Sequence, residues 1–107
     1  MDKEHVEKLA TLAQQEKGCA LQDALKHEDK DTHYATLASM AKRSAEMRKD
    51  NPSLPAVTVM SIGDSGSDDH FVRVDGKSIY RKSFGSSAGS QLARLLIGNV
   101  PECTEKK

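Results

Sequence analysis

The chain has 107 residues, of which 36% are hydrophobic and 30% are charged, so it is long enough for one modest core but not for two. Lys plus Arg and Asp plus Glu both number 16, which excludes a basic excess that would attract nucleic acid or acidic membranes to the whole chain. We therefore expect a single domain over residues 1–107.

Neither targeting signals nor metal-ligand spacings stand out. The first 20 residues hold no apolar run suited to a signal peptide or a membrane span, which predicts a cytoplasmic protein without a membrane partner. Cys19 and Cys103 lie at opposite ends of the chain, so we expect two reduced and unrelated thiols. The histidines lack zinc-site spacing, so we expect surface histidines, no metal and no cofactor. These four residues are His5, His27, His33 and His70.

Apolar residues with helical spacing occupy the first half of the chain. Over residues 3–17 they recur at i, i+3, i+4 and i+7, which predicts a first helix that Gly18 interrupts. The pattern resumes at Ala20 in a short second helix. A third helix is capped by Asp31 or Thr32.

The third helix ends at Asn51, because the following Pro52 disfavours helical backbone at the residue before it. Small and apolar residues form its predicted stripe, which we expect to face the core and which offers a surface for a partner helix or a second copy. The stripe contains Tyr34, Leu37, Ala38, Ala41 and Ala45, with Met40 and Met47 beside it.

The second half of the chain has the residue pattern of β-strands joined by turns. Residues 56–62 form a β-branched run that predicts a strand. Residues 70–74 and 77–84 flank Asp75 and Gly76, a dipeptide typical of a two-residue type I′ hairpin turn.

Apolar residues at 92–97, followed by Gly98 and a proline, predict a last helix. The fold class is therefore α+β, with a helical part at about 3–50 and a β-β-β-α part at about 55–100. The β-β-β portion is expected to be a three-stranded antiparallel meander. We expect the tail 101–107 to be disordered.

A two-residue turn sorts the hairpin side chains onto two faces. Val72, Val74 and Ile79 form an aliphatic face that suits the last helix. The other face carries Phe71, Arg73, Tyr80, Lys82 and Phe84. If that face points outward, it has the composition that stacks bases and holds phosphates; alternatively, it packs on the N-terminal helices.

The segment after the hairpin matches G-x-S-x-G, the pattern of a nucleophile elbow, but no histidine follows it to serve as a base. We interpret it as helix capping. A second possibility is an anion site at the start of the last helix, made by Ser86, Ser87 and Gly89.

With no catalytic constellation, the sequence favours a small non-enzymatic interaction or regulatory protein, such as an inhibitor or adaptor of bacterial or mobile-element origin. A protein partner is expected, including a homodimer through the N-terminal helices. The alternative is a nucleic-acid-binding module that uses the hairpin and the last helix. Its candidate binding residues are Phe71, Arg73, Lys77, Tyr80, Arg81, Lys82 and Arg94.

Overall fold

The structure is a computed structural model that describes residues 3–64 and 67–84, together with Val100 and Cys103. Three helices come first and three strands follow. The helices are α1 (Lys3–Gln14), α2 (Gly18–Leu25) and α3 (Lys30–Asp50), and the strands are β1 (Val57–Asp64), β2 (Ser67–Val74) and β3 (Lys77–Phe84).

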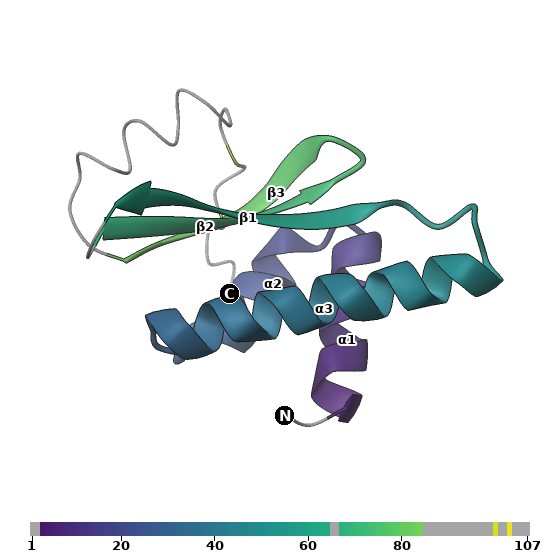
Figure 1. Ribbon diagram of the computed structural model, residues 1–107, viewed down its shortest axis with the longest axis horizontal. Coiled ribbons are helices and arrows are strands. Elements are labelled where there is room, and N and C mark those ends of the chain that lie inside the picture. Colours follow the sequence, from purple (N-terminus) through teal and green to yellow (C-terminus); the bar gives the residue numbers. More distant parts are fainter. Residues whose placement is uncertain (1–2, 65–66, 85–99, 101–102, 104–107) are drawn as a thin grey trace.

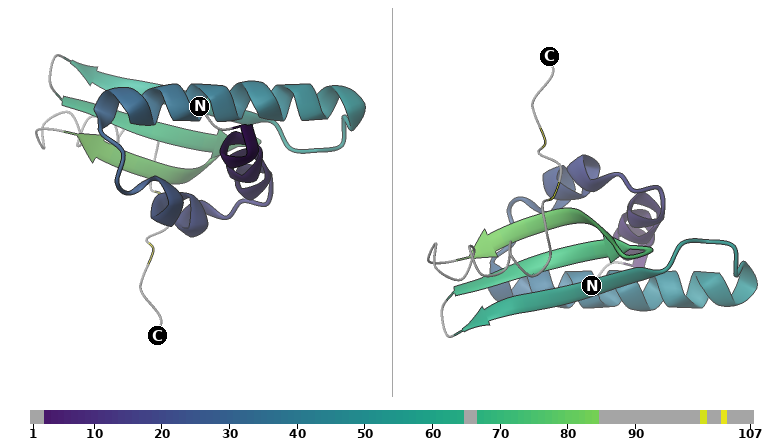
Figure 2. Two further views of the ribbon diagram at one scale, coloured as in Figure 1. Left: turned by 90° about the horizontal axis from the view of Figure 1, so that it is seen from below. Right: turned by 90° about the horizontal axis from the view of Figure 1, so that it is seen from above.

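The elements form two layers, with the sheet on one side and all three helices against one of its faces (Figure 1). Helix α3 runs beneath β1, and α1 and α2 lie beyond it on the side of β2 and β3 (Figure 2). This arrangement confirms the expected α+β class and the three helices before the sheet. The expected last helix at 92–97 lies outside the described residues, so its place in the order remains a prediction.

The sheet is an antiparallel meander in the order β1-β2-β3, as the short connections predicted. Asp75 and Gly76 make the predicted tight turn, with φ angles of 51° and 82°. The pairing is then shifted by a β-bulge: Arg73 pairs with Ser78, but Val72 pairs with Tyr80, so Ile79 is the extra residue.

The bulge corrects the predicted sorting of side chains. Tyr80 now shares a face with Val72, and both belong to the core against the helices. Phe71 pairs with Arg81 on the opposite face, where it is fully buried. The aliphatic face thus packs on the N-terminal helices, and the rings of Tyr80 and Phe84 lie on the same side of the sheet.

The corner between α1 and α2 is built by two residues. Glu16 adopts a φ of 59°. The N–H of Lys17 donates to the Leu12 carbonyl at 2.9 Å, and the N–H of Glu16 donates to the Ala13 carbonyl at 2.9 Å. This is a Schellman ending with Glu16 in the position that glycine usually takes. Gly18 begins α2 rather than ending α1, and a Cβ there would collide with the carbonyl oxygen of Ile79.

Helix α3 begins two or three residues earlier than expected, because the side chain of Asp29 caps it by accepting from the Thr32 N–H at 2.9 Å. Its inward face also differs from the predicted stripe. Buried positions include three polar residues, whereas Ala38 and Ala45 are exposed. The buried residues of α3 are His33, Thr36, Leu37, Met40 and Ser44.

The main core lies between the helices and the sheet. Its buried members are Leu9, Ala10, Ala13, Leu21, Leu25, Leu37, Met40, Val57, Val72, Val74, Ile79 and Tyr80. No helix in the described part of the chain is long and apolar enough to cross a membrane.

Candidate functional site

A chain of hydrogen bonds crosses the core between α3 and the sheet. Nδ1 of His33 lies 2.7 Å from Nδ1 of His70 on β2, and Nε2 of His33 lies 2.6 Å from the hydroxyl oxygen of Tyr80 on β3. The two imidazole rings stack at 4.9 Å, and the Phe84 ring meets that of His33 edge-on at 5.2 Å. All three hydrogen-bonding side chains are buried. We call His33, His70 and Tyr80 the histidine network.

The network limits how much charge it can hold. The two facing Nδ1 atoms can share one proton but not two, because two N–H donors would point at each other. If His33 donates through Nδ1, its Nε2 accepts from the Tyr80 hydroxyl; in the other tautomer, Nε2 donates to the Tyr80 oxygen. Both arrangements keep the buried polar atoms of His33 satisfied while it is neutral.

Burial reinforces the neutral state. The pKa of His33 is lowered to about 4, first by desolvation and then by the proximity of His70 and Lys82. Burial and the nearby Glu28 carboxylate raise the pKa of Tyr80. At neutral pH His33 is therefore uncharged, and the network acts as a clamp that joins one helix to two strands.

The network corrects the expectation of surface histidines, since His33 is 0% and His70 is 2% exposed. Sequence reasoning missed the pair because the two residues lie 37 positions apart. A signal was present: His33 precedes Leu37 and Met40 by four and seven residues, which places all three on one helical face.

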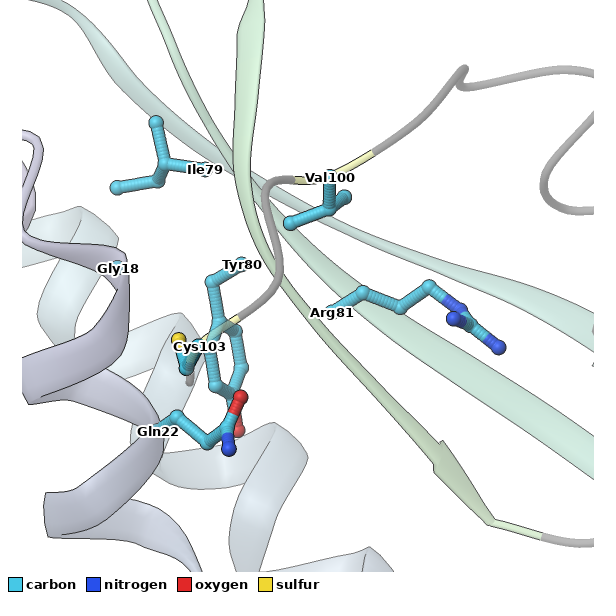
Figure 3. A pocket seen from close by; sticks show the side chains of 7 residues that line it. All are labelled: Gly18, Gln22, Ile79, Tyr80, Arg81, Val100 and Cys103. Atoms are coloured by element: carbon cyan, nitrogen blue, oxygen red, sulfur yellow. The ribbon is translucent and has the colours of Figure 1, made fainter. Parts of the chain in front are cut away.

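A disulfide corrects the expectation of two unrelated thiols, because Cys19 on α2 is bonded to Cys103. The remaining tail residues, other than Val100 and Cys103, lie outside the described part. The bond borders a surface pocket of about 280 Å³ (Figure 3). Its lining consists of Gly18, Gln22, Ile79, Tyr80, Arg81, Val100 and Cys103.

The basic side chains of the hairpin are held by groups of the protein itself. Arg73 donates to the Gly76 carbonyl at 2.6 Å, and Lys77 forms an ion pair with Glu16 at 2.7 Å. Lys82 donates to the carbonyl of Lys26 at 3.0 Å, which ties β3 to the end of α2.

Arg81 has the strongest local partner. Its Nε donates to the buried carboxylate of Asp69 at 2.9 Å, and the hydroxyl of Ser83 donates to the same oxygen at 3.0 Å. A guanidinium held in this way has less freedom to bind an external phosphate.

The aromatic residues proposed for base stacking are not accessible, since Phe71 is 0% and Tyr80 is 2% exposed. They lie on opposite faces of the sheet, so they form no common platform. The remaining candidate residues lie outside the described part of the chain: these are Arg94 and the anion-site residues Ser86, Ser87 and Gly89.

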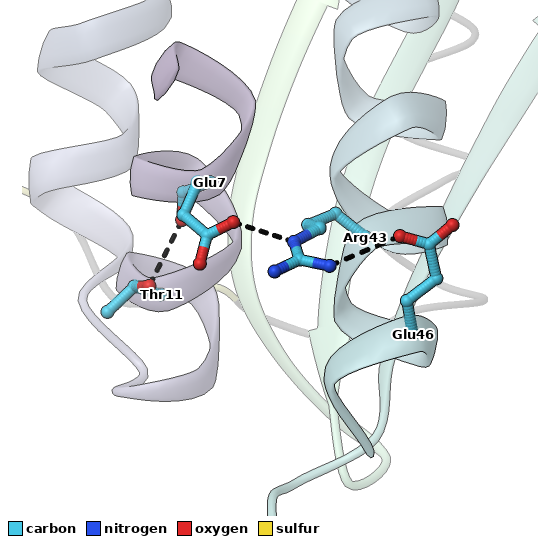
Figure 4. Close-up of polar contacts among 4 residues, drawn as sticks. All are labelled: Glu7, Thr11, Arg43 and Glu46. Carbon is cyan, nitrogen blue, oxygen red and sulfur yellow. Dashed lines mark hydrogen bonds and ion pairs between the residues drawn. The ribbon is translucent and has the colours of Figure 1, made fainter. Parts of the chain in front are cut away.

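A groove of about 470 Å³ lies between α1 and α3. Charged side chains tie its walls together: Arg43 donates to Glu7 at 2.7 Å and to Glu46 at 3.3 Å (Figure 4). These contacts lower the pKa of Glu7 and raise that of Arg43. The charged side chains along this groove are thus paired with one another.

The outer edge of β1 has a different character. Within residues 3–64 and 67–84, no strand pairs with it. Residues 56–63 carry no charge and no proline, and Thr58, Met60 and Ser61 are exposed, Met60 by 37%. Natural proteins usually protect such edges with charges, prolines, bulges or a covering element.

The opposite edge, on β3, has several of these protections. Lys77, Arg81 and Lys82 lie along it, the bulge at Ile79 interrupts its ladder, and α2 packs against it. The Ile79 carbonyl lies so close to α2 that only glycine fits at position 18. One edge of the sheet is therefore closed and the other is open.

The open edge continues onto α3. Arg43 marks the side of α3 that packs against α1, and the alanines at 38, 41 and 45 lie on the side turned away from it. Tyr34 is on the same side and is 40% exposed. Figure 2 shows β1 running along α3. We call the outer edge of β1 (residues 57–63) together with Tyr34, Ala38, Ala41 and Ala45 the lateral face.

The described residues contain no group of three or more His, Cys, Asp or Glu side chains that could hold a metal ion. Comparisons with protein-family models, with curated proteins and with solved structures find no match to this chain. The lateral face and the histidine network are therefore interpreted from their own geometry.

Proposed function

We propose that this chain is a non-enzymatic protein-interaction domain that binds its partner by strand addition at the open edge of β1. The observation that carries the proposal is the contrast between an unpaired, uncharged β1 edge and a protected β3 edge. Strand addition uses main-chain hydrogen bonds for affinity and neighbouring side chains for specificity.

The other polar features support a structural role rather than chemistry. The Tyr80 hydroxyl is hydrogen-bonded to His33, and the Arg81 guanidinium is hydrogen-bonded to Asp69. Each of these groups stabilises the fold by linking two elements, which leaves the lateral face as the surface best suited to a partner.

The disulfide indicates the kind of compartment in which the chain would work. Disulfides persist in oxidising surroundings and are rare in the reducing cytosol. We therefore propose that the chain works in an oxidising compartment, in place of the cytoplasmic location predicted from the lack of an apolar run in its first 20 residues.

Nucleic-acid binding remains an untested alternative with less support. It requires exposed aromatic rings and free cations, whereas Phe71 and Tyr80 are buried and Arg73, Lys77, Arg81 and Lys82 are bonded within the protein.

Site-specific photo-crosslinking in the producing cell tests the proposed function. A photoreactive phenylalanine analogue replaces Met60 on the open edge, and a control chain carries it at Asp23, which is exposed on α2. We expect protein adducts at position 60 and none at position 23. Equal adduct formation at both positions, or none at either, would refute strand addition at β1.

A further inference from the structure

We infer that the occupant of the open edge is a second copy of this chain, joined antiparallel to the first about a two-fold axis at Met60, so that two three-stranded sheets become one of six strands. The inference rests on the proposed function, and it names the partner. It follows from the register of β1, from the side chains that this register brings together, and from the helix beneath the edge.

The register shows which backbone groups are free. One step beyond the Val57–Val74 pair, the Asp75 N–H donates to the Ala56 carbonyl at 2.9 Å and the Ala56 N–H donates to the Asp75 carboxylate at 3.0 Å, so the polar groups of Ala56 point toward β2. Because this direction alternates along antiparallel strands, the N–H and C=O groups of every second residue from Val57 point away from β2. The outward residues are Val57, Val59, Ser61 and Gly63.

Two copies can pair only where outward groups meet outward groups. An axis at Met60 places Val57 opposite Gly63 of the second copy and Val59 opposite Ser61 of the second copy. All four outward residues of each copy are then used, for about eight inter-chain hydrogen bonds. Shifting the axis by one position in either direction leaves one outward residue of each copy unpaired.

This register also matches the side chains. On the face opposite the helices, Met60 meets Met60 of the second copy, and Thr58 meets Ile62 of the second copy. No charged residue lies between positions 56 and 63, so no like charges are opposed. The exposed Met60 thus becomes the centre of an apolar contact.

The helix beneath the edge favours a second copy over an isolated peptide strand. A peptide added to β1 would cover the edge but leave Tyr34 and the exposed Ala38 and Ala45 in water. A second copy brings its own α3 under its own β1. Small side chains on both helices allow the close approach that adjacent strands impose.

A cysteine placed on the axis tests the inference. In an antiparallel pair, directly opposed residues that do not hydrogen-bond to each other have Cα atoms about 4.5 Å apart, within disulfide range. Met60→Cys should therefore form a covalent dimer under mild oxidation. Thr58→Cys is the matched control, since the two copies of position 58 would lie about 14 Å apart.

Cross-linking is read on non-reducing gels, and peptide mass spectrometry confirms a 60–60 bond while the Cys19–Cys103 bond remains intact. Equal cross-linking of both variants, or none of Met60→Cys at concentrations where the wild type is dimeric by sedimentation, would overturn the register. A wild type that stays monomeric at high concentration would overturn the second copy as partner.

Charge pairing gives an independent readout. Met60→Lys and Met60→Glu each place two like charges on the axis, so each alone should dimerise at least tenfold more weakly than the wild type. An equimolar mixture should recover a heterodimer, because Lys then faces Glu. Failure of the mixture to associate more tightly than either variant alone would contradict self-pairing at Met60.

The two proposals can fail separately. If photo-crosslinking at position 60 yields an adduct only with a different protein, strand addition stands and the second copy is excluded. If position 60 yields no adduct at all, both proposals fail. Circular dichroism of the Met60 variants monitors the fold, which an exposed edge substitution should leave intact.

Discussion

The two edges of the sheet differ in how far other parts of the protein cover them. On β3, Gly18 brings α2 against the Ile79 carbonyl, Lys82 bonds to the end of α2, and the Cys19–Cys103 bond lies beside the same strand. On β1, an uncharged row of residues ends at the surface with its outward backbone groups unpaired among the described residues.

The contrast shows how a small sheet can be stable and still offer a binding surface. Covalent, steric and polar links gather on the β3 side and around α3, whereas the β1 edge contributes little to the folded monomer. Variants on the closed side should therefore cost stability, and variants on the open edge should cost association.

The largest loss is expected from opening the disulfide. The Cys19→Ser, Cys103→Ser double variant removes a link between residues 84 positions apart, which should lower the free energy of unfolding by about 4 kcal/mol. Urea denaturation of wild type and double variant measures the difference. Identical midpoints would show that the bond does not hold the β3 side closed.

Acidification should weaken the clamp between α3 and the sheet. His33 is neutral in both folded and unfolded chains above pH 6.5, but between pH 6.5 and about 4 only the unfolded chain gains its proton. Above pH 6.5, His33 therefore does not lower the free energy of unfolding. As the pH drops to about 4, protonation of His33 in the unfolded chain lowers that free energy by about 3 kcal/mol.

Denaturation at several pH values measures this loss, and His33→Phe supplies the control because it removes the titrating group. The variant should be less stable at neutral pH, since His70 and Tyr80 lose a partner. It should also show a shallower pH dependence between pH 6.5 and 4. An unchanged slope would mean that His33 is not held neutral in the fold.

A single methyl group tests the closure of β3. Gly→Ala ordinarily stabilises a helix, but Gly18→Ala places a Cβ against the Ile79 carbonyl and should destabilise the fold by about 2 kcal/mol. Thermal unfolding followed by circular dichroism checks the sign. A higher melting temperature for the variant would show that α2 does not seal the β3 edge.

The smallest effect is expected on the open edge. Met60→Lys should change the stability of the dilute monomer by less than about 0.5 kcal/mol, because the side chain is 37% exposed. Denaturation below the dissociation concentration of the dimer measures it. A loss comparable to that of the disulfide variant would abolish the contrast between the two edges.

Much of the local structure could be predicted from the sequence. Apolar spacing located α1, α2 and α3, and the Asp75–Gly76 turn located the hairpin. The predictions that were wrong concern contacts between distant residues. The bulge at Ile79 places Tyr80 on the helix side of the sheet. The buried face of α3 is partly polar because His33 bonds to His70 on β2.

The candidate site was less predictable. The alanines of α3 were noted as a possible pairing surface, and Ala38 and Ala45 are indeed exposed. The predicted meander already placed the strand at 56–62 at an edge of the sheet, but the sequence did not show that this edge is unprotected whereas the β3 edge is covered by α2. The hairpin cations were predicted as free, whereas protein groups engage each of those in the described residues.

The sequence by itself determined the helices, the strands and the tight turn, because spacing and turn chemistry act over a few residues. Tertiary structure decided that Cys19 meets Cys103, that His33 meets His70 and that α2 covers the β3 edge of the sheet. Each of these depends on where distant parts of the chain come together in space, which no local pattern of residues encodes.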